Sequence, residues 1–279
     1  MNVEQRNKAM KDPYKMAIQR SRMEREPQAE LPPGETPAPE AKFDRVRPTL
    51  DVAHLNRERL VENRVVCFQE RSPMTTGFDL LRTKLQMALR ERKWQTVMIT
   101  SPTAQCGKTV TAINLAMSLA RQKDLVTVLA DFDFRHPSIA RYLGVNRPVD
   151  VKNLIRREAS VNEVLFTTDV SGPGLRVLAT MSPVSRPAEI LASAGMADLI
   201  DDLKASVPGG IILFDMPPIL GSDDVLSFLP NVDGVLLLAA SGHTKSQELI
   251  YCRSQIPEEK LIGIVFSKSS ERSEDYYYY

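Results

Sequence analysis

Residues 96–116, TVMITSPTAQCGKTVTAINLA, decide the fold of this chain. An apolar run of strand length at 96–100 leads through a loop ending in GKT at 107–109 into an apolar helix predicted over 110–119. In a phosphate-binding loop, backbone amides at the start of a helix cradle the phosphates, the lysine reaches the β and γ oxygens, and the hydroxyl holds magnesium. The stretch therefore predicts a site for nucleotide phosphates and Mg2+.

The start of this loop differs from the common pattern, because Pro102 stands where the first glycine is usual. The match is short, and the alternative is that Lys108 and Thr109 simply form the first turn of an ordinary helix. The position between a strand and a helix favours the phosphate loop, since the motif requires that context. The predicted nucleotide contacts in this stretch are Ala104, Gln105, Cys106, Gly107, Lys108, Thr109 and Val110.

Two further apolar runs end in aspartate, VLADFDFR at 128–135 and IILFDMPP at 211–218. Alternation along a strand would point the Asp131 and Asp133 side chains the same way, into the crevice at the carboxyl ends of parallel strands. Phosphoryl transfer needs a carboxylate to orient or deprotonate the attacking oxygen and a second group to hold magnesium. A single strand-end aspartate would more often cap a helix. The predicted catalytic residues are Lys108, Asp131 and Asp133, and the predicted magnesium ligands are Thr109, Asp131 and Asp215.

The remaining apolar runs have the length of strands buried on both faces, and helical segments separate them. This pattern predicts an α/β fold of the P-loop NTPase type, a doubly wound and mainly parallel sheet flanked by helices. The predicted strands are 96–100, 126–130, 175–179, 211–214, 235–239 and 261–266, and helices are predicted from 76 to 89, 110 to 119 and 188 to 203.

The 279 residues, 43% of them hydrophobic, can bury one substantial core. Residues 1–50 mix charges with prolines and predict a disordered arm. We expect a P-loop kinase domain over 51–270 and a C-terminal tyrosine tail over 271–279.

The balance of charge argues against nucleic acid as a partner, because 36 basic and 35 acidic residues leave a formal charge of +1. Three cysteines without metal-ligand spacing indicate a reducing, cytoplasmic compartment. No stretch approaches the roughly 18 apolar residues of a membrane span, and the N-terminus has no apolar signal segment. Any membrane association is therefore expected to come through a partner.

The chain ends in four tyrosines on a polar segment that already carries Glu271, Glu274 and Asp275. A run of phenols at a terminus carries an aggregation cost, and a role as phosphate acceptors explains it most simply. The alternative is an adhesive peptide that docks on a partner. A phosphoryl donor site together with acceptor phenols suggests a tyrosine autokinase with phosphoacceptors Tyr276, Tyr277, Tyr278 and Tyr279.

From about residue 51 onward the chain resembles the bacterial tyrosine kinases. The most specific element is Asp-x-Asp-x-Arg after an apolar strand, matched by Asp131, Asp133 and Arg135. Further similarities are the Asp-x-x-Pro motif at 215–218, RPAEILAS at 186–193 and SDDVL at 222–226.

This resemblance implies a cytoplasmic kinase of exopolysaccharide and capsule systems that binds ATP and Mg2+. It implies phosphorylation of the tyrosine tail, typically on a neighbouring subunit of a ring, and activation by a membrane adaptor or polysaccharide co-polymerase at the inner face of the membrane. Lys108 and Thr109 would bind ATP phosphate and magnesium, and Asp131 would be the leading catalytic carboxylate. Asp133 and Asp215 would complete the metal shell, and Arg135 joins the predicted nucleotide contacts.

Two positions depart from the family pattern. The family loop usually reads Pro-Gly-Glu-Gly-Lys, whereas this loop has bulkier residues at 104–106. The family's ring-forming Glu-x-x-Arg-x-x-Arg corresponds here to Thr76, Asp79 and Arg82, of which the last alone matches, so homo-oligomerisation stays open.

A different class of function remains an alternative: a nucleotide switch or scaffold related to the positioning ATPases, which would bind ATP to dock a membrane polysaccharide co-polymerase. Such ATPases usually carry a second, signature lysine early in the loop. This loop has none, and the tyrosine tail also favours the kinase.

Overall fold

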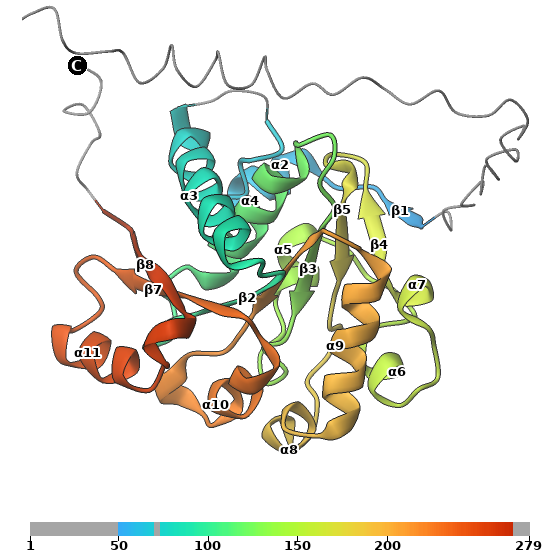
Figure 1. Cartoon of the computed structure of the whole chain (residues 1–279). Coiled ribbons are helices and arrows are strands. Elements are labelled where there is room, and N and C mark those ends of the chain that lie inside the picture. The colour runs from blue at the N-terminus through green and yellow to red at the C-terminus, as the bar shows by residue number, and fades with distance from the viewer. Residues whose placement is uncertain (1–49, 70–72, 270–279) are drawn as a thin grey trace, which may run out of the picture. The chain divides into compact units, whose positions relative to one another are not determined.

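The structure, a computed structural model, describes residues 50–69 and 73–269 (Figure 1). The predicted arm, apart from Leu50, and the predicted tyrosine tail lie outside these residues. None of the described helices is long and apolar enough to cross a bilayer.

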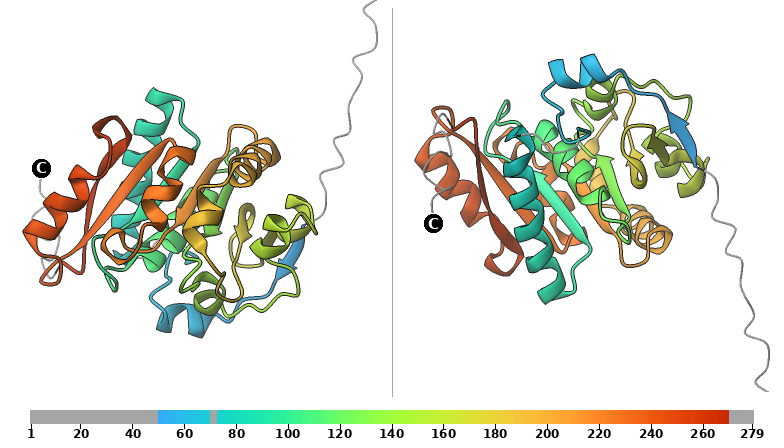
Figure 2. Two further views of the ribbon diagram at one scale, coloured as in Figure 1. Left: turned by 90° about the horizontal axis from the view of Figure 1, so that it is seen from below. Right: turned by 90° about the horizontal axis from the view of Figure 1, so that it is seen from above.

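The described chain forms one eight-stranded sheet with the order β1-β4-β5-β3-β6-β2-β7-β8. All neighbouring strands are parallel except β4 and β5. The C-terminal β8 forms one edge of the sheet and the N-terminal β1 the other, as the views from below and above show (Figure 2). The strands are β1 (Asp51–Ala53), β2 (Thr96–Thr100), β3 (Thr127–Asp131), β4 (Phe166–Thr168), β5 (Gly172–Leu178), β6 (Ile211–Asp215), β7 (Gly234–Ala240) and β8 (Leu261–Ser267).

Helices cover both faces of the sheet and enclose two separate cores, so the predicted doubly wound, mainly parallel α/β fold is confirmed. Successive residues of β2 show the alternation. Val97 and Ile99 enter the core beneath α3 (Thr76–Arg92) and α4 (Lys108–Ala120), whereas Met98 enters the core beneath α9 (Ala194–Ser206) and α10 (Asp224–Phe228). The α-helices are α2 (Arg57–Glu62), α3 (Thr76–Arg92), α4 (Lys108–Ala120), α5 (Ile139–Leu143), α6 (Val151–Ile155), α7 (Val161–Val164), α8 (Pro187–Leu191), α9 (Ala194–Ser206), α10 (Asp224–Phe228) and α11 (Ser246–Ser254).

The prediction of one helix over 188–203 was wrong, because the chain forms α8 and α9 there. Ser193 separates them with extended backbone, and its hydroxyl accepts the N–H of Met196 at 3.2 Å. This cap begins a new helix. The apolar spacing continues across the break, so periodicity alone did not reveal it.

The sheet order brings the ends of β2, β3 and β6 together. In the parallel register, Asp131 of β3 pairs with Asp215 of β6, and Asp215 pairs with Ile99 of β2. Neighbouring strands lie about 4.8 Å apart, so the two carboxylates leave adjacent strands at the same level. The loop after β2 starts at the same, carboxyl ends of the strands.

Candidate nucleotide and magnesium site

The loop between β2 and α4 has the backbone of a phosphate cradle. Gly107 is the N-cap of α4 with φ of 86°, and Lys108 is the first helical residue. Gln105 also has a positive φ, 62°. Both values lie in the left-handed region, where a side chain is unfavourable and glycine is not. Gln105 therefore holds a glycine-type conformation at the position where the family loop usually has a glycine.

We expect Gln105→Gly to tighten nucleotide binding, by about 1 kcal/mol or roughly fivefold in Kd, because glycine adopts this backbone without strain and lets phosphate approach closely. Titration of the purified protein with a fluorescent ATP analogue measures the change. Gln247→Gly, on the exposed surface of α11, is a control for the loss of a glutamine elsewhere. Weaker binding by the Gln105 variant would mean that the amide itself contacts the nucleotide.

Residues far away in the sequence form hydrogen bonds with the loop between β2 and α4. The Ser267 hydroxyl, at the end of β8, donates to the carbonyl of Cys106 at 2.7 Å. The His243 ring nitrogen lies 3.1 Å from the carbonyl of Ala104, and the Cys106 thiol lies 3.5 Å from the Thr244 hydroxyl. No sequence motif singles out Ser267, Thr244 or His243. The position of Ser267 at a strand's carboxyl end was the one available signal.

The predicted magnesium ligands Thr109 and Asp215 are in direct contact. The Thr109 hydroxyl donates to Asp215 Oδ2 at 2.6 Å and lies 3.1 Å from the hydroxyl of Ser138. Lys108 is buried beside them, and its charge lowers the pKa of Asp215 against the larger, opposing effect of burial. The start of α4 and the end of β6 are therefore joined by the hydrogen bond between the Thr109 hydroxyl and the Asp215 carboxylate.

Asp131 is fully buried and is held by the start of α5. Its Oδ2 accepts the backbone N–H groups of Ser138 and Ile139, both at 2.8 Å. Its Oδ1 is buried and has no hydrogen-bond partner in the described part of the chain. Asp131 therefore caps α5 with one oxygen and leaves the other available. Helix capping and the predicted role in the site are therefore compatible in one side chain.

The third predicted carboxylate, Asp133, is half-buried, and its Oδ1 accepts the N–H of His136 at 3.0 Å. Its negative charge raises the pKa of Asp131 and of Asp215. Burial is the larger cause for both: it raises the pKa of Asp131 well above its ordinary value and that of Asp215 to about 7. Two buried carboxylates, one half-buried carboxylate and one buried lysine thus lie together at the carboxyl ends of β3 and β6.

This donor set fits Mg2+. Asp215 Oδ1, like Asp131 Oδ1, is buried and has no hydrogen-bond partner among the described residues. Magnesium prefers oxygen ligands, and it is usually held by one or two carboxylates together with substrate phosphates and water. No group of three or more His, Cys, Asp or Glu side chains within 50–69 and 73–269 is arranged as a metal cage. Thr109, Asp131 and Asp215 would therefore hold the ion jointly with nucleotide phosphate.

The raised pKa of Asp215 predicts a pH dependence of stability in the absence of metal. The pKa of Asp215 is about 7 in the folded chain and about 4 in an unfolded chain. The contribution of this carboxyl group to the free energy of unfolding is therefore complete below about pH 4 and is lost as the pH rises through 7. Asp215→Asn should remove this loss. The melting temperature of the variant relative to wild type should therefore be higher at pH 8 than at pH 5 by on the order of 5 °C. Melting curves in EDTA measure it. Parallel pH profiles for the two proteins would contradict the assignment.

Arg135, predicted to contact nucleotide, forms a bidentate ion pair with Asp224 at 2.7 and 2.9 Å. Asp224 is fully buried at the start of α10, and this hydrogen-bonded pair raises the pKa of Arg135. The guanidinium is thus fixed to the segment SDDVL at 222–226. The other predicted contact, Val110, lies in the first turn of α4 on the wall of a groove beside Gly107.

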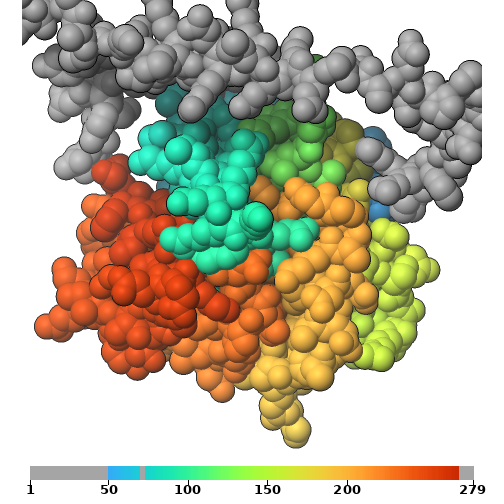
Figure 3. All heavy atoms as spheres, in the orientation of Figure 1, coloured from blue at the N-terminus to red at the C-terminus, as the bar shows by residue number. Residues whose placement is uncertain are grey.

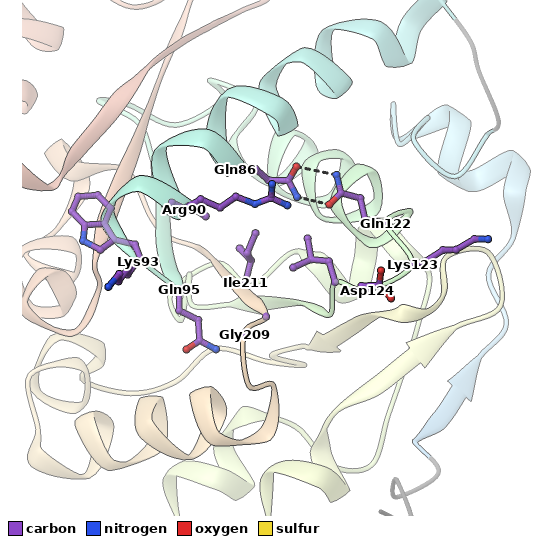
Figure 4. A pocket seen from close by; sticks show the side chains of 13 residues that line it. Gln86, Arg90, Lys93, Gln95, Gln122, Lys123, Asp124, Gly209 and Ile211 are labelled. Carbon is purple, nitrogen blue, oxygen red and sulfur yellow. Dashed lines mark hydrogen bonds between the residues drawn. The ribbon is translucent and has the colours of Figure 1, made fainter. Parts of the chain in front are cut away.

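A separate pocket of about 510 Å3 lies at the opposite, amino end of the strands (Figure 4). The amides of Gln86 and Gln122 face each other across α3 and α4 and form two hydrogen bonds, at 2.6 and 2.9 Å. None of the sequence motifs lies there. Ligands of open α/β sheets bind at the carboxyl ends of the strands, so the candidate site is assigned to that end.

Several proteins named as tyrosine-protein kinases are similar to this chain in sequence. YwqD of Bacillus subtilis is 29% identical over 225 residues, which cover 79% of this chain and 92% of that protein. EpsB of Ralstonia nicotianae, a putative tyrosine-protein kinase, is 28% identical over 197 residues. These residues cover 70% of this chain and 26% of EpsB. No family profile matches the chain.

A solved kinase domain has a similar fold. The kinase domain of VpsO superposes with a TM-score of 0.61 at 26% sequence identity, over 76% of this chain and 97% of that domain. The P-loop type of the sheet, predicted from the order of the motifs, is therefore confirmed.

Proposed function

The chain is a relative of the bacterial tyrosine-protein kinases, and from this premise we propose that it is an ATP-dependent protein-tyrosine kinase that phosphorylates its own C-terminal tyrosines. The observation that carries the proposal is the pair of buried, unpartnered oxygens on Asp131 and Asp215, on adjacent strands beside the Thr109 hydroxyl. This arrangement suits a cation and an attacking hydroxyl group, which phosphoryl transfer requires together.

In the proposed reaction, the loop amides and Lys108 would bind the β- and γ-phosphates, and Thr109, Asp131 and Asp215 would hold magnesium. The bound ion would neutralise charge on the transferred group. Asp131 orients the acceptor phenol and takes its proton as the phenolic oxygen bonds to the γ-phosphorus and the bond to ADP breaks. The burial that raises its pKa makes Asp131 a stronger proton acceptor than an exposed carboxylate.

The proposal includes the predicted organisation: a kinase domain over 51–270 between an arm at 1–50 and the acceptor tail at 271–279. A membrane adaptor, of the polysaccharide co-polymerase type, would recruit the kinase to the inner face of the membrane, where it would regulate exopolysaccharide or capsule polymerisation and export. Asp79 and Arg82, at the ring-motif positions, pair with each other at 3.1 Å within α3. A ring would therefore have to form without free use of both side chains.

Replacing Tyr276, Tyr277, Tyr278 and Tyr279 together with phenylalanine should remove more than about 90% of self-phosphorylation, because the acceptor hydroxyls are lost while the aromatic surface stays. ATP affinity should be unchanged, since the site lies in the described domain. Phosphotyrosine immunoblotting and nucleotide titration measure the two properties. Undiminished labelling would place the acceptors elsewhere.

Glutamate replacements of the same four tyrosines should favour smaller assemblies at low salt, where charge repulsion is least screened.

The second candidate, a nucleotide switch or scaffold ATPase, is supported by the bulkier residues of the loop at 104–106. The two functions differ in where the γ-phosphate goes. The deciding experiment measures ADP and phosphotyrosine in the same reaction with Mg2+, ATP and an adaptor fragment. A kinase forms about one phosphotyrosine per ADP in the first turnovers, whereas a switch ATPase forms ADP and free phosphate.

A further inference from the structure

An apolar groove of about 630 Å3 lies beside the phosphate loop, between α3, the start of α4 and the end of β8. The space-filling view shows α3 and the C-terminal part of the chain side by side on the surface (Figure 3). Two of its walls are exposed apolar side chains: Phe266 of β8 is 66% exposed and Val61 of α2 is 44% exposed. The apolar lining residues are Val61, Val66, Met74, Phe78, Leu81, Val110, Val265 and Phe266.

Exposed aromatic and aliphatic side chains gathered in one concave surface mark a binding site for an apolar or aromatic group. The charged side chains among the described lining residues, Arg64 and Lys268, are both basic. The groove therefore suits an occupant with aromatic rings next to acidic groups.

We propose that the tyrosine tail of the same chain occupies this groove. Residues 276–279 supply four aromatic rings, and Glu274 and Asp275 directly before them supply the acidic groups that match Arg64 and Lys268. Tyrosine combines an apolar ring with a polar tip, which suits a half-open apolar site. The inference depends on the proposed function only where it calls these tyrosines phosphate acceptors.

The path of the chain supports its own tail over that of a second copy. Ser267 and Lys268 line the groove, and φ of 56° at Lys268 turns the backbone as it leaves β8. The tail thus starts at the rim. The seven Cα-to-Cα steps from Ser269 to Tyr276 reach at most about 25 Å, which keeps Tyr276 close to the groove, and the other three tyrosines follow it directly. A tether this short gives an effective concentration in the millimolar range, far above that of a second molecule in dilute solution.

Docking would hold the acceptors beside the phosphate loop, since Gly107, Val110 and Thr111 also line the groove. Unmodified tyrosines would thereby be stored next to the site without occupying the carboxylate edge formed by Asp131 and Asp215.

The test is photocrosslinking of the full chain without nucleotide, with Tyr277 replaced by the photoreactive analogue p-benzoylphenylalanine. Crosslinks within one chain to peptides containing Val61 or Phe266 are expected. Phe266→Asp should reduce them at least about tenfold, whereas the matched control Ile250→Asp, on exposed α11, should leave them unchanged. Crosslinks between two chains, at other surfaces, or with equal yield in the Phe266 variant would overturn the proposal.

A second measurement requires no photochemistry. Deleting residues 276–279 should at least double the binding of an apolar fluorescent dye, and the increase should be absent in the Phe266→Asp background. No increase on deletion would contradict docking. Both measurements omit ATP, so a failure here with intact tail phosphorylation rejects only the docking, and the reverse result rejects only the kinase assignment.

Discussion

Replacing Lys108 with methionine is expected to abolish phosphotyrosine formation, with a loss of at least about 100-fold in rate, because removal of one charge-stabilising donor from a phosphoryl site costs this much or more. Lys108 is buried at the first position of α4, where its charge acts on Asp215 and, in the proposed function, on the nucleotide phosphates. Methionine retains the length of the side chain, so the melting temperature should stay within about 5 °C of wild type. Quantitative phosphotyrosine detection after incubation with Mg2+ and ATP measures the loss.

Lys84→Met is the matched control, since Lys84 makes the same substitution possible on the exposed surface of α3. This variant should retain wild-type labelling. Undiminished labelling in the Lys108 variant would reject the assignment of the loop to phosphate binding.

Asp131→Asn should reduce phosphoryl transfer at least about 100-fold and change ATP affinity by less than about threefold. The asparagine oxygen can still accept the N–H groups of Ser138 and Ile139, while the proton acceptor is lost. Single-turnover kinetics and nucleotide titration separate the two effects. An equal loss of affinity and rate would indicate a purely structural aspartate.

The stability of the same variant provides an internal check. Burial and the neighbouring charge of Asp215 raise the pKa of Asp131, so its carboxylate form is unfavourable in the metal-free fold. The asparagine variant should therefore melt no lower than wild type at pH 8. A lower melting temperature would mean that reduced activity reflects damage to α5.

The sequence revealed the central strands and the site motifs because both signals are local. Strands buried on both faces are continuous apolar runs, and each motif follows such a run directly. The three-residue strands β1 and β4 lack that signal. The supports of the phosphate loop were missed for a different reason: Ser267 bonds to a residue 161 positions away, and no local pattern encodes that contact.

Arg135 illustrates the same limit. The motif with Asp131 and Asp133 identified it, but its tight partner Asp224 lies 89 residues further along the chain. A strand-end arginine fits phosphate contact and ion pairing equally well in sequence. The structure shows the ion pair with the buried carboxylate of Asp224, and that burial comes from the packing of α10 against the rest of the fold. The contact of Arg135 with nucleotide stays a prediction.

The most direct test of the central claim is peptide mass spectrometry of the purified chain after incubation with Mg2+, ATP and a membrane-adaptor fragment. The account predicts phosphate on one or more of the tyrosines at 276–279 in the wild-type chain, and none in the Lys108→Met variant treated in the same way. Formation of ADP by the wild-type chain without any phosphotyrosine in the tail would contradict it.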